Sequence, residues 1–285
     1  MIWVPGSINQ DTFLFPKSLP RDGETVISET IINKLGGKGA NSAIAASLAT
    51  NKTVHFIGGV GDDDAAHFIG EALEKYDNLA VDLTVIPNCS SGRAFINVDK
   101  QGENQIIIVP GANFKAFDSK MIEKIPQNPD FLICNFEIPE NFVLEIFEKI
   151  SEKTKKILNF SPISKNLEIV RKILKLTDYL ILNEIEADFL KNELDLVKNV
   201  VLTKGSKGAS LLKNGVEVFK FEAPKIQPVS TVGTGDCFLG TFVASLDDGF
   251  SEEDSIQRAI AAASSCCLKH GAADSYEKLE KILKY

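Results

Sequence analysis

Short apolar runs alternate with helix-like patterns along most of this chain, and the alternation restricts the folds open to it. From about residue 39 onward, apolar runs are followed by stretches with the 3.6-residue spacing of an amphipathic helix. Such βαβ alternation produces a mostly parallel sheet with helices on both faces. The sequence therefore predicts an α/β fold with a doubly wound, mostly parallel sheet. We predict strands at residues 2–4, 53–58, 131–134, 156–159, 179–182 and 199–203, and helices at residues 42–49, 63–75, 141–153, 184–191, 236–246, 252–269 and 276–283.

Two regions break this alternation, because strand-like runs follow each other there without a helix between them. They are residues 11–35 and residues 93–110, and residues 100–103 have the composition of a hairpin turn. We interpret both regions as a small β-sheet lid over the carboxyl edge of the main sheet, where open α/β sheets bind ligands. The length allows residues 1–285 to form one domain with this lid as a minor element.

Composition and charge exclude several classes of function. The chain has 31 Lys and Arg against 39 Asp and Glu, which gives a net charge of −8 and argues against binding nucleic acid or an anionic membrane. No apolar stretch is long enough for a membrane span, and the N-terminus lacks a signal segment. The 5 cysteines lack metal-ligand spacing. We therefore expect a cytoplasmic protein whose thiols stay reduced.

Residues 229–240 carry the strongest functional motif. They read Val-Ser-Thr-Val-Gly-Thr-Gly-Asp-Cys-Phe-Leu-Gly, and a helix pattern starts within them. A Gly-x-Gly-Asp turn at a helix start leaves backbone N–H groups free to bind an anion, with Asp236 beside them. An anion hole next to a carboxylate suits phosphoryl transfer to a hydroxyl, with the carboxylate as proton acceptor. The alternative is a tight turn in which Asp236 only caps the helix.

Two further polar turns suit a polyol substrate. Residues 35–41 read Leu-Gly-Gly-Lys-Gly-Ala-Asn, where glycines permit close approach and Lys38 and Asn41 offer charge and hydrogen bonds. Asn9 and Asp11 lie two residues apart after the first strand, so they face the same way on an extended chain. Each of them can bind two hydroxyl groups.

Taken in chain order, these three motifs resemble those of the ribokinase-like carbohydrate kinases, the phosphofructokinase B family. Residues 182–186 are similar to the family's Asn-x-x-Glu motif, and residues 202–208 are similar to its nucleotide loop. The resemblance covers nearly the whole chain. Residues 23–25, 102–104 and 110–113 point to the ribokinase branch of the family.

The resemblance implies an ATP- and Mg²⁺-dependent kinase for a primary hydroxyl of a free pentose, with D-ribose giving ribose 5-phosphate as the leading reaction. It implies the following roles: Asn9, Asp11, Gly37, Lys38, Asn41 and Glu137 bind sugar together with Asp236; Asn183, Thr203, Gly205, Ser206, Gly208 and Gly235 contact ATP; Gly233, Thr234 and Gly235 form the anion hole; Glu186 organises Mg²⁺ through water; and Asp236 is the base. The helix N-terminus leads us to expect that Asp236 stays ionised at neutral pH. Family members pair their lids, so we expect a homodimer that hides the lid's strand edges.

Several plainer readings stay open. Asn183 and Glu186 are also typical of a helix start, and residues 203–208 are also typical of an ordinary turn. The small-residue run 259–267 is typical of close helix packing as well as of a surface that contacts adenine. Residues 62–64 are three aspartates, and we expect one of them to cap the following helix rather than the group to bind a metal.

Departures from the family pattern leave the exact substrate open. Ser230 stands where potassium-dependent members have Asp, and Val232 replaces a frequent Thr, so a K⁺ site is doubtful. Arg93 on a lid strand would hold a sugar phosphate or lie in solvent. The alternatives are therefore a phosphofructokinase-like kinase for a sugar phosphate, a kinase for another free sugar or a nucleoside, and a sugar sensor without catalysis.

Overall fold

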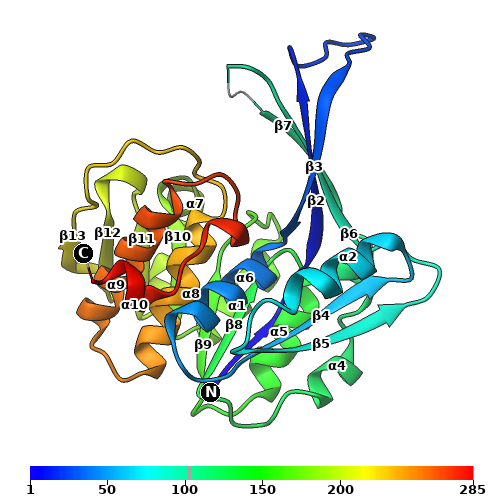
Figure 1. Ribbon diagram of the computed structural model, residues 1–285. Coiled ribbons are helices and arrows are strands. Elements are labelled where there is room, and N and C mark those ends of the chain that lie inside the picture. Colours follow the sequence, from blue (N-terminus) through cyan, green and yellow to red (C-terminus); the bar gives the residue numbers. More distant parts are fainter. Residues whose placement is uncertain (102–103, 285) are drawn as a thin grey trace.

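A large sheet forms the centre of the molecule (Figure 1). The computed structural model describes residues 1–101 and 104–284. Within them the sheet has nine strands, all neighbours parallel except β11 with β12 and β12 with β13. The predicted doubly wound fold is confirmed. In spatial order the strands are β13 (Val216–Phe221), β12 (Ala209–Lys213), β11 (Asn199–Thr203), β10 (Tyr179–Asn183), β9 (Lys155–Asn159), β8 (Phe131–Asn135), β1 (Ile2–Pro5), β4 (Val54–Gly61) and β5 (Leu79–Ile86).

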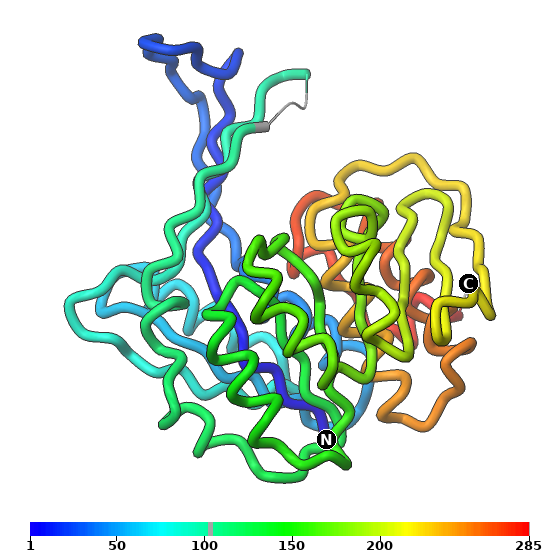
Figure 2. Tube along the Cα trace, turned by 180° about the vertical axis from the view of Figure 1, so that it is seen from behind, coloured from blue at the N-terminus to red at the C-terminus, as the bar shows by residue number. Residues whose placement is uncertain are grey.

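Helices cover both faces of this sheet, as Figures 1 and 2 show from opposite sides. Successive strand residues point to opposite faces, so on β4 Phe56 packs into one core layer and Ile57 into the other. One layer contains α1 (Lys38–Ala49), α2 (Asp64–Leu73), α8 (Thr234–Asp247), α9 (Glu252–Cys266) and α10 (Leu279–Ile282). The other contains α3 (Ala112–Lys115), α4 (Ser119–Glu123), α5 (Glu140–Lys149), α6 (Leu167–Leu176) and α7 (Glu184–Phe189). Short 3₁₀ turns are η1 (Leu194–Leu196), η2 (Gly205–Lys207) and η3 (Ala273–Ser275).

A second, smaller sheet rises away from the body as a lid (Figure 2). Its strands, in the order β3 (Ser28–Gly36), β2 (Asn9–Pro16), β6 (Gly92–Val98) and β7 (Asn104–Val109), come from the two regions that the sequence singled out. β2 and β6 are parallel, and the outer pairs are antiparallel. Residues 102 and 103 of the predicted hairpin turn lie outside the described residues.

The site is positioned by the point where the sheet's strand order reverses. β1 lies between β4 and β8, and the chain then proceeds outward on both sides. The loops that leave β1 and β8 therefore diverge and open a crevice at the carboxyl edge, the usual ligand position in such sheets. The lid strand β2 starts at Asn9, directly beside this crevice.

Helices α1 and α8 approach each other closely because small residues line their contact. A Cβ added to Gly240 of α8 would lie 2.2 Å from the backbone oxygen of Ser42 and 2.7 Å from the nitrogen of Ala46. Only glycine permits this approach. The packing brings the N-terminus of α1 next to that of α8.

Some predicted helix limits need correction. The helix predicted over residues 276–283 forms only as the short α10, because Tyr276 is buried with an extended backbone, at ψ 144°, and Lys278, just before the helix, is also non-helical, at ψ 125°. The helices predicted to end at residues 153 and 269 end at Lys149 and Cys266. Asp63 caps α2 by accepting from the N–H of Ala66, as predicted. None of the helices in the described part of the chain has the length and apolar character needed to span a membrane.

Candidate active site

The start of α8 presents the predicted anion-binding backbone. Gly233 precedes the helix with φ 73°, a left-handed conformation that favours glycine, and in the described residues no side chain caps this end. The first N–H groups of a helix lack partners within it, so those of Gly235 and Asp236 are available to an anion, while that of Thr234 makes a long 3.4 Å contact with the Thr231 oxygen. The geometry suits a phosphoryl group.

Asp236 is buried in the first turn of this helix beside two groups from α1. Asn41 Nδ2 donates to Asp236 Oδ2 at 3.1 Å. Burial raises the pKa of Asp236, while the Lys38 ammonium and the Asn41 hydrogen bond act in the opposite direction. The shift is opposite to the one that the helix N-terminus alone predicts, because desolvation outweighs the dipole. A raised pKa makes the carboxylate a stronger proton acceptor.

Lys38 and Glu137 meet at the start of α1. The backbone N–H of Lys38 donates to Glu137 Oε2 at 2.9 Å, and Ser7 Oγ donates to the same oxygen at 2.6 Å. The charge of Asp236 is the largest cause of a raised pKa for Lys38, which therefore stays protonated. Gly37, at φ 92°, allows this turn, since a Cβ there would lie 2.8 Å from the Ser7 carbonyl oxygen. Sequence reasoning missed Ser7, whose partner is distant in the chain.

Asn9 and Asp11 lie at the foot of the lid. Asn113 Nδ2 donates to Asn9 Oδ1 at 2.7 Å, which leaves the amide hydrogens of Asn9 to point elsewhere. Burial, then the charges of Glu137 and Asp236, raise the pKa of Asp11 to about 7. Its Oδ1 is buried and has no hydrogen-bond partner among the described residues. A buried carboxylate oxygen without a partner in the protein is suited to a ligand hydroxyl.

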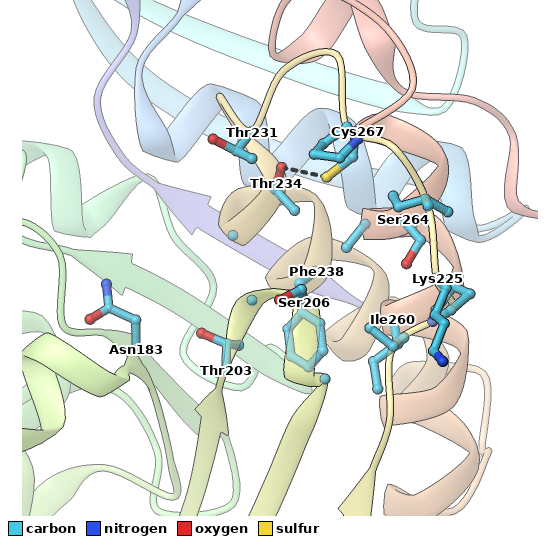
Figure 3. Close-up of a pocket in the computed structure, with 18 residues that line it drawn as sticks. Asn183, Thr203, Ser206, Lys225, Thr231, Thr234, Phe238, Ile260, Ser264 and Cys267 are labelled. Carbon is cyan, nitrogen blue, oxygen red and sulfur yellow. Dashed lines mark hydrogen bonds between the residues drawn. The ribbon is translucent and has the colours of Figure 1, made fainter. Parts of the chain in front are cut away.

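A cavity of about 530 Å³ opens on the other side of the α8 N-terminus (Figure 3). All the residues that sequence reasoning assigned to ATP line it: Asn183, Thr203, Gly205, Ser206, Gly208 and Gly235, together with Thr234 of the anion hole. The α9 residues Ile260, Ala263 and Ser264 form the opposite wall, with Cys267 just beyond the helix. These belong to the run for which both helix packing and an adenine contact were left open.

Part of the cavity wall carried no sequence signal. The segment after β13 contributes Ala223, Pro224, Lys225, Ile226 and Pro228. No motif marks these residues, because a loop that lines a pocket needs shape more than residue type. Phe238 of α8 was also missed, since its apolar side chain fits the helix's buried pattern equally well.

Asn183 and Glu186 form a capping box at the start of α7. Asn183 Oδ1 accepts from the N–H of Ile185 and of Glu186, and Glu186 Oε2 accepts from the N–H of Asn183 at 2.8 Å. The helix-start reading is therefore correct, and it leaves one Glu186 oxygen and the Asn183 amide nitrogen outside the box. Burial raises the pKa of Glu186. Mg²⁺ keeps several waters and takes one or two carboxylates plus substrate phosphates, so this donor set fits it.

Two other predicted residues have structural partners. Arg93 forms an ion pair with Asp63 at 3.2 Å. Ser230 Oγ accepts from the N–H of Val232 at 3.3 Å. The expectation that a K⁺ site is doubtful stays a prediction.

The chain is similar to known proteins over its whole length. The profile of the pfkB family carbohydrate kinases matches residues 1–279. Ribokinase from Dictyostelium discoideum is 33% identical over 318 residues, covering 99% of this chain and 98% of that protein.

Solved structures agree with this similarity. Ribokinase from Thermotoga maritima has a TM-score of 0.88 at 30% identity and covers 100% of this chain and 99% of its own. Arabidopsis thaliana ribokinase in complex with ribose and ATP has a TM-score of 0.83 at 28% identity and covers 99% and 97%. This chain therefore belongs to the pfkB family of carbohydrate kinases.

Proposed function

We propose that the protein phosphorylates D-ribose on its primary hydroxyl with ATP and produces ribose 5-phosphate. The family defines the class, ATP-dependent phosphorylation of a carbohydrate hydroxyl. The observation that carries the proposal is the buried Asp236, which lies at the helix N-terminus between the polar crevice and the cavity. Relatives along the whole chain are ribokinases, and one was solved with ribose and ATP.

In this proposal the two ligands meet at Asp236. The sugar lies among Asn9, Asp11, Gly37, Lys38, Asn41 and Glu137, and ATP lies in the cavity along Asn183, Thr203, Gly205, Ser206 and Gly208. The hydroxyl oxygen bonds to the γ-phosphorus, the bond from phosphorus to the bridging oxygen breaks, ADP leaves, and the hydroxyl proton passes to Asp236. The backbone of residues 233–235 stabilises the charge of the transferring group. Mg²⁺, held by Glu186 through water, would neutralise phosphate charge.

Charge in the crevice favours a free sugar over a sugar phosphate. The charges of Asp236, Glu137 and Glu186 act on the pKa of Lys38, and those of Glu137 and Asp236 act on the pKa of Asp11. The phosphate of a sugar phosphate placed there would meet the carboxylates of Glu137 and Asp236, and like charges in a buried site repel strongly. Arg93, the side chain that could have compensated, is paired with Asp63.

A coupled assay that measures ADP release tests which substrate the protein phosphorylates. Ribose should give the highest kcat/KM among ribose, fructose, fructose 6-phosphate and adenosine. A higher value with fructose 6-phosphate or adenosine would replace ribose as the substrate. Sugar binding without ADP release from any of them would support the non-catalytic sensor.

We further propose a homodimer joined through the lids. Large apolar side chains are exposed on both outer lid strands: Ile31 and Ile32 on β3, and Ile106, Ile107 and Ile108 on β7. Exposed apolar edge strands are sites of strand pairing or packing in other chains. The proposed compartment is the cytosol, where the free thiols of all the cysteines would persist.

A further inference from the structure

The carbonyl oxygen of Gly233 receives a hydrogen bond from outside its own helix. Tyr276 Oη donates to it at 2.7 Å, and the N–H of Cys237 donates to it at 2.9 Å. The bond from Cys237 is the first hydrogen bond of helix α8. The bond from Tyr276 comes from a side chain 43 residues further along the chain. We propose that Tyr276 is a positioning residue for the anion hole, and that its hydroxyl fixes the orientation of the backbone that binds the transferring phosphoryl group. This inference rests on the proposed role of residues 233–235.

Peptide geometry connects this hydrogen bond to the anion hole. The carbonyl of Gly233 and the N–H of Thr234 belong to one planar peptide unit and point in opposite directions. Holding the oxygen therefore also sets the direction of the Thr234 N–H. Gly233 has no Cβ and lies at φ 73°, so its own torsions constrain this peptide little.

The helix itself holds only one side of this peptide firmly, through the 2.9 Å bond from the Cys237 N–H to the Gly233 oxygen. No side chain caps α8 among the described residues, and the N–H of Thr234 reaches the Thr231 oxygen only at 3.4 Å. Tyr276 supplies a second short contact to the Gly233 oxygen, at 2.7 Å. A Cβ on Gly233 would lie 2.7 Å from the Tyr276 hydroxyl oxygen and 2.6 Å from Ala272 Cβ, so the surrounding residues fit closely around a glycine.

The hydroxyl of Tyr276 remains a donor throughout the physiological pH range. Its side chain is buried, and burial, followed by the charge of Asp236, raises its pKa well above the ordinary value. The segment that carries it is itself held in place. Ser275 Oγ donates to the Ala272 carbonyl at 2.6 Å, and Lys34 Nζ of the lid strand β3 donates to the His270 carbonyl at 3.2 Å.

The test is Tyr276→Phe, which removes the hydroxyl and keeps the ring. The matched control is Tyr179→Phe, because Tyr179 Oη also donates a hydrogen bond, to Glu252 Oε1 at 2.7 Å. Tyr179 is the first residue of β10, so it lies at the amino end of the strands, away from the carboxyl edge. We expect Tyr276→Phe to lower kcat by about 10- to 100-fold, since small displacements of a catalytic group have effects of that size. KM for ribose and for ATP should change by less than about 3-fold, because a group needed mainly in the transition state alters kcat.

A binding measurement separates positioning from a purely structural role. With ribose present, affinity for ADP plus aluminium fluoride, a planar mimic of the transferring phosphoryl group, should fall in Tyr276→Phe by about the same factor as kcat. Affinity for ADP alone should not change. Equal kcat in Tyr276→Phe and Tyr179→Phe overturns the inference. An equal loss of affinity for ADP alone and for ADP plus aluminium fluoride also overturns it, as does failure of Tyr276→Phe to fold. If wild type and Tyr179→Phe also fail to phosphorylate ribose, the proposed function is what fails.

Discussion

At the scale of single residues, the crevice concentrates negative charge around one ammonium group. Burial, then the charges of Glu137 and Asp236, raise the pKa of Asp11, and the charge of Asp236 is the largest cause of the raised pKa of Lys38. Charges held together in a buried site reduce the stability of the protein without ligand. We expect this site to favour ligand binding at the expense of folding stability, as functional sites often do.

The first prediction concerns Asp236→Asn, which preserves shape and removes the proton acceptor. We expect kcat to fall by about 10²–10⁴-fold, the usual range for loss of general-base catalysis. Calorimetric affinities for ribose and for an unreactive ATP analogue should change little, since backbone forms the anion hole. Asp248→Asn, at the far end of α8, is the control and should keep wild-type kcat. Another residue is the base if Asp236→Asn keeps more than about a tenth of wild-type kcat.

The second prediction follows from the pKa of Asp11, which is about 7 in the folded protein against 3.8 for an ordinary Asp. Between these values the folded state holds a proton that the unfolded state has lost, so stability decreases as pH rises through this window and levels off above it. Asp11→Asn removes this penalty. Its gain in Tm over wild type should therefore grow from pH 5 to pH 8, reaching a few degrees, or roughly 1–3 kcal/mol.

The control for Asp11→Asn is Asp22→Asn, the same substitution at an exposed lid position. Ribose affinity should fall in Asp11→Asn and stay unchanged in the control. A Tm difference for Asp11→Asn that is constant across this pH range would contradict the assigned shift.

At the scale of elements, the contact between α1 and α8 sets the distance between Lys38, Asn41 and Asp236. The third prediction is that Gly240→Ala separates these helices, because the added Cβ would overlap the Ser42 oxygen. We expect a loss of about 1–3 kcal/mol in stability, typical of overpacking, and a kcat lower by about 10-fold.

Gly70→Ala in α2 provides the matched control for Gly240→Ala. No atom lies within 4 Å of a Cβ at Gly70, so alanine should stabilise the helix by about 0.5–1 kcal/mol without changing kcat. Thermal melts and initial rates of both variants are the measurements. Unchanged kcat in Gly240→Ala would show that the spacing of α1 and α8 does not control the site.

The central strands could be predicted almost to the residue, because strands buried on both faces form continuous apolar runs. β11 is the clearest case, since both its predicted ends match. Tyr276 shows the opposite situation. Its surroundings have a helical pattern, but Tyr276 has an extended backbone and its hydroxyl bonds to Gly233, so tertiary contacts override the local propensity.

The candidate site was predictable where a motif concentrates its residues and hidden where partners are far apart in sequence. The residues proposed for sugar and ATP come from short motifs, and the structure brings them to one crevice and one adjoining cavity. Asn113, which orients Asn9, is 104 residues away from it. Such contacts depend on the complete topology, which residue spacing cannot supply.

At the scale of the whole molecule, the fourth prediction concerns assembly. Wild-type protein should have a dimeric mass by light scattering at micromolar concentration, and Ile107→Glu in β7 should be monomeric, because a charge would be buried between the lids. Val216→Glu is the control, since Val216 is equally exposed but lies on β13 at the edge of the main sheet. A monomeric mass for wild type contradicts the proposed homodimer.

The lid is joined to the crevice proposed for the sugar without a linker, and this has a mechanical consequence. β2 starts at Asn9 and extends for 8 residues, while β3 ends at Gly36, two residues before Lys38. At about 3.3 Å per residue, β2 is a lever arm of roughly 25 Å, so a rotation of about 10° at Asn9 would displace the lid tip by about 4 Å. A fluorescent reporter at the tip would therefore amplify small adjustments around the sugar, and the kinase could serve as the sensing element of a sugar biosensor.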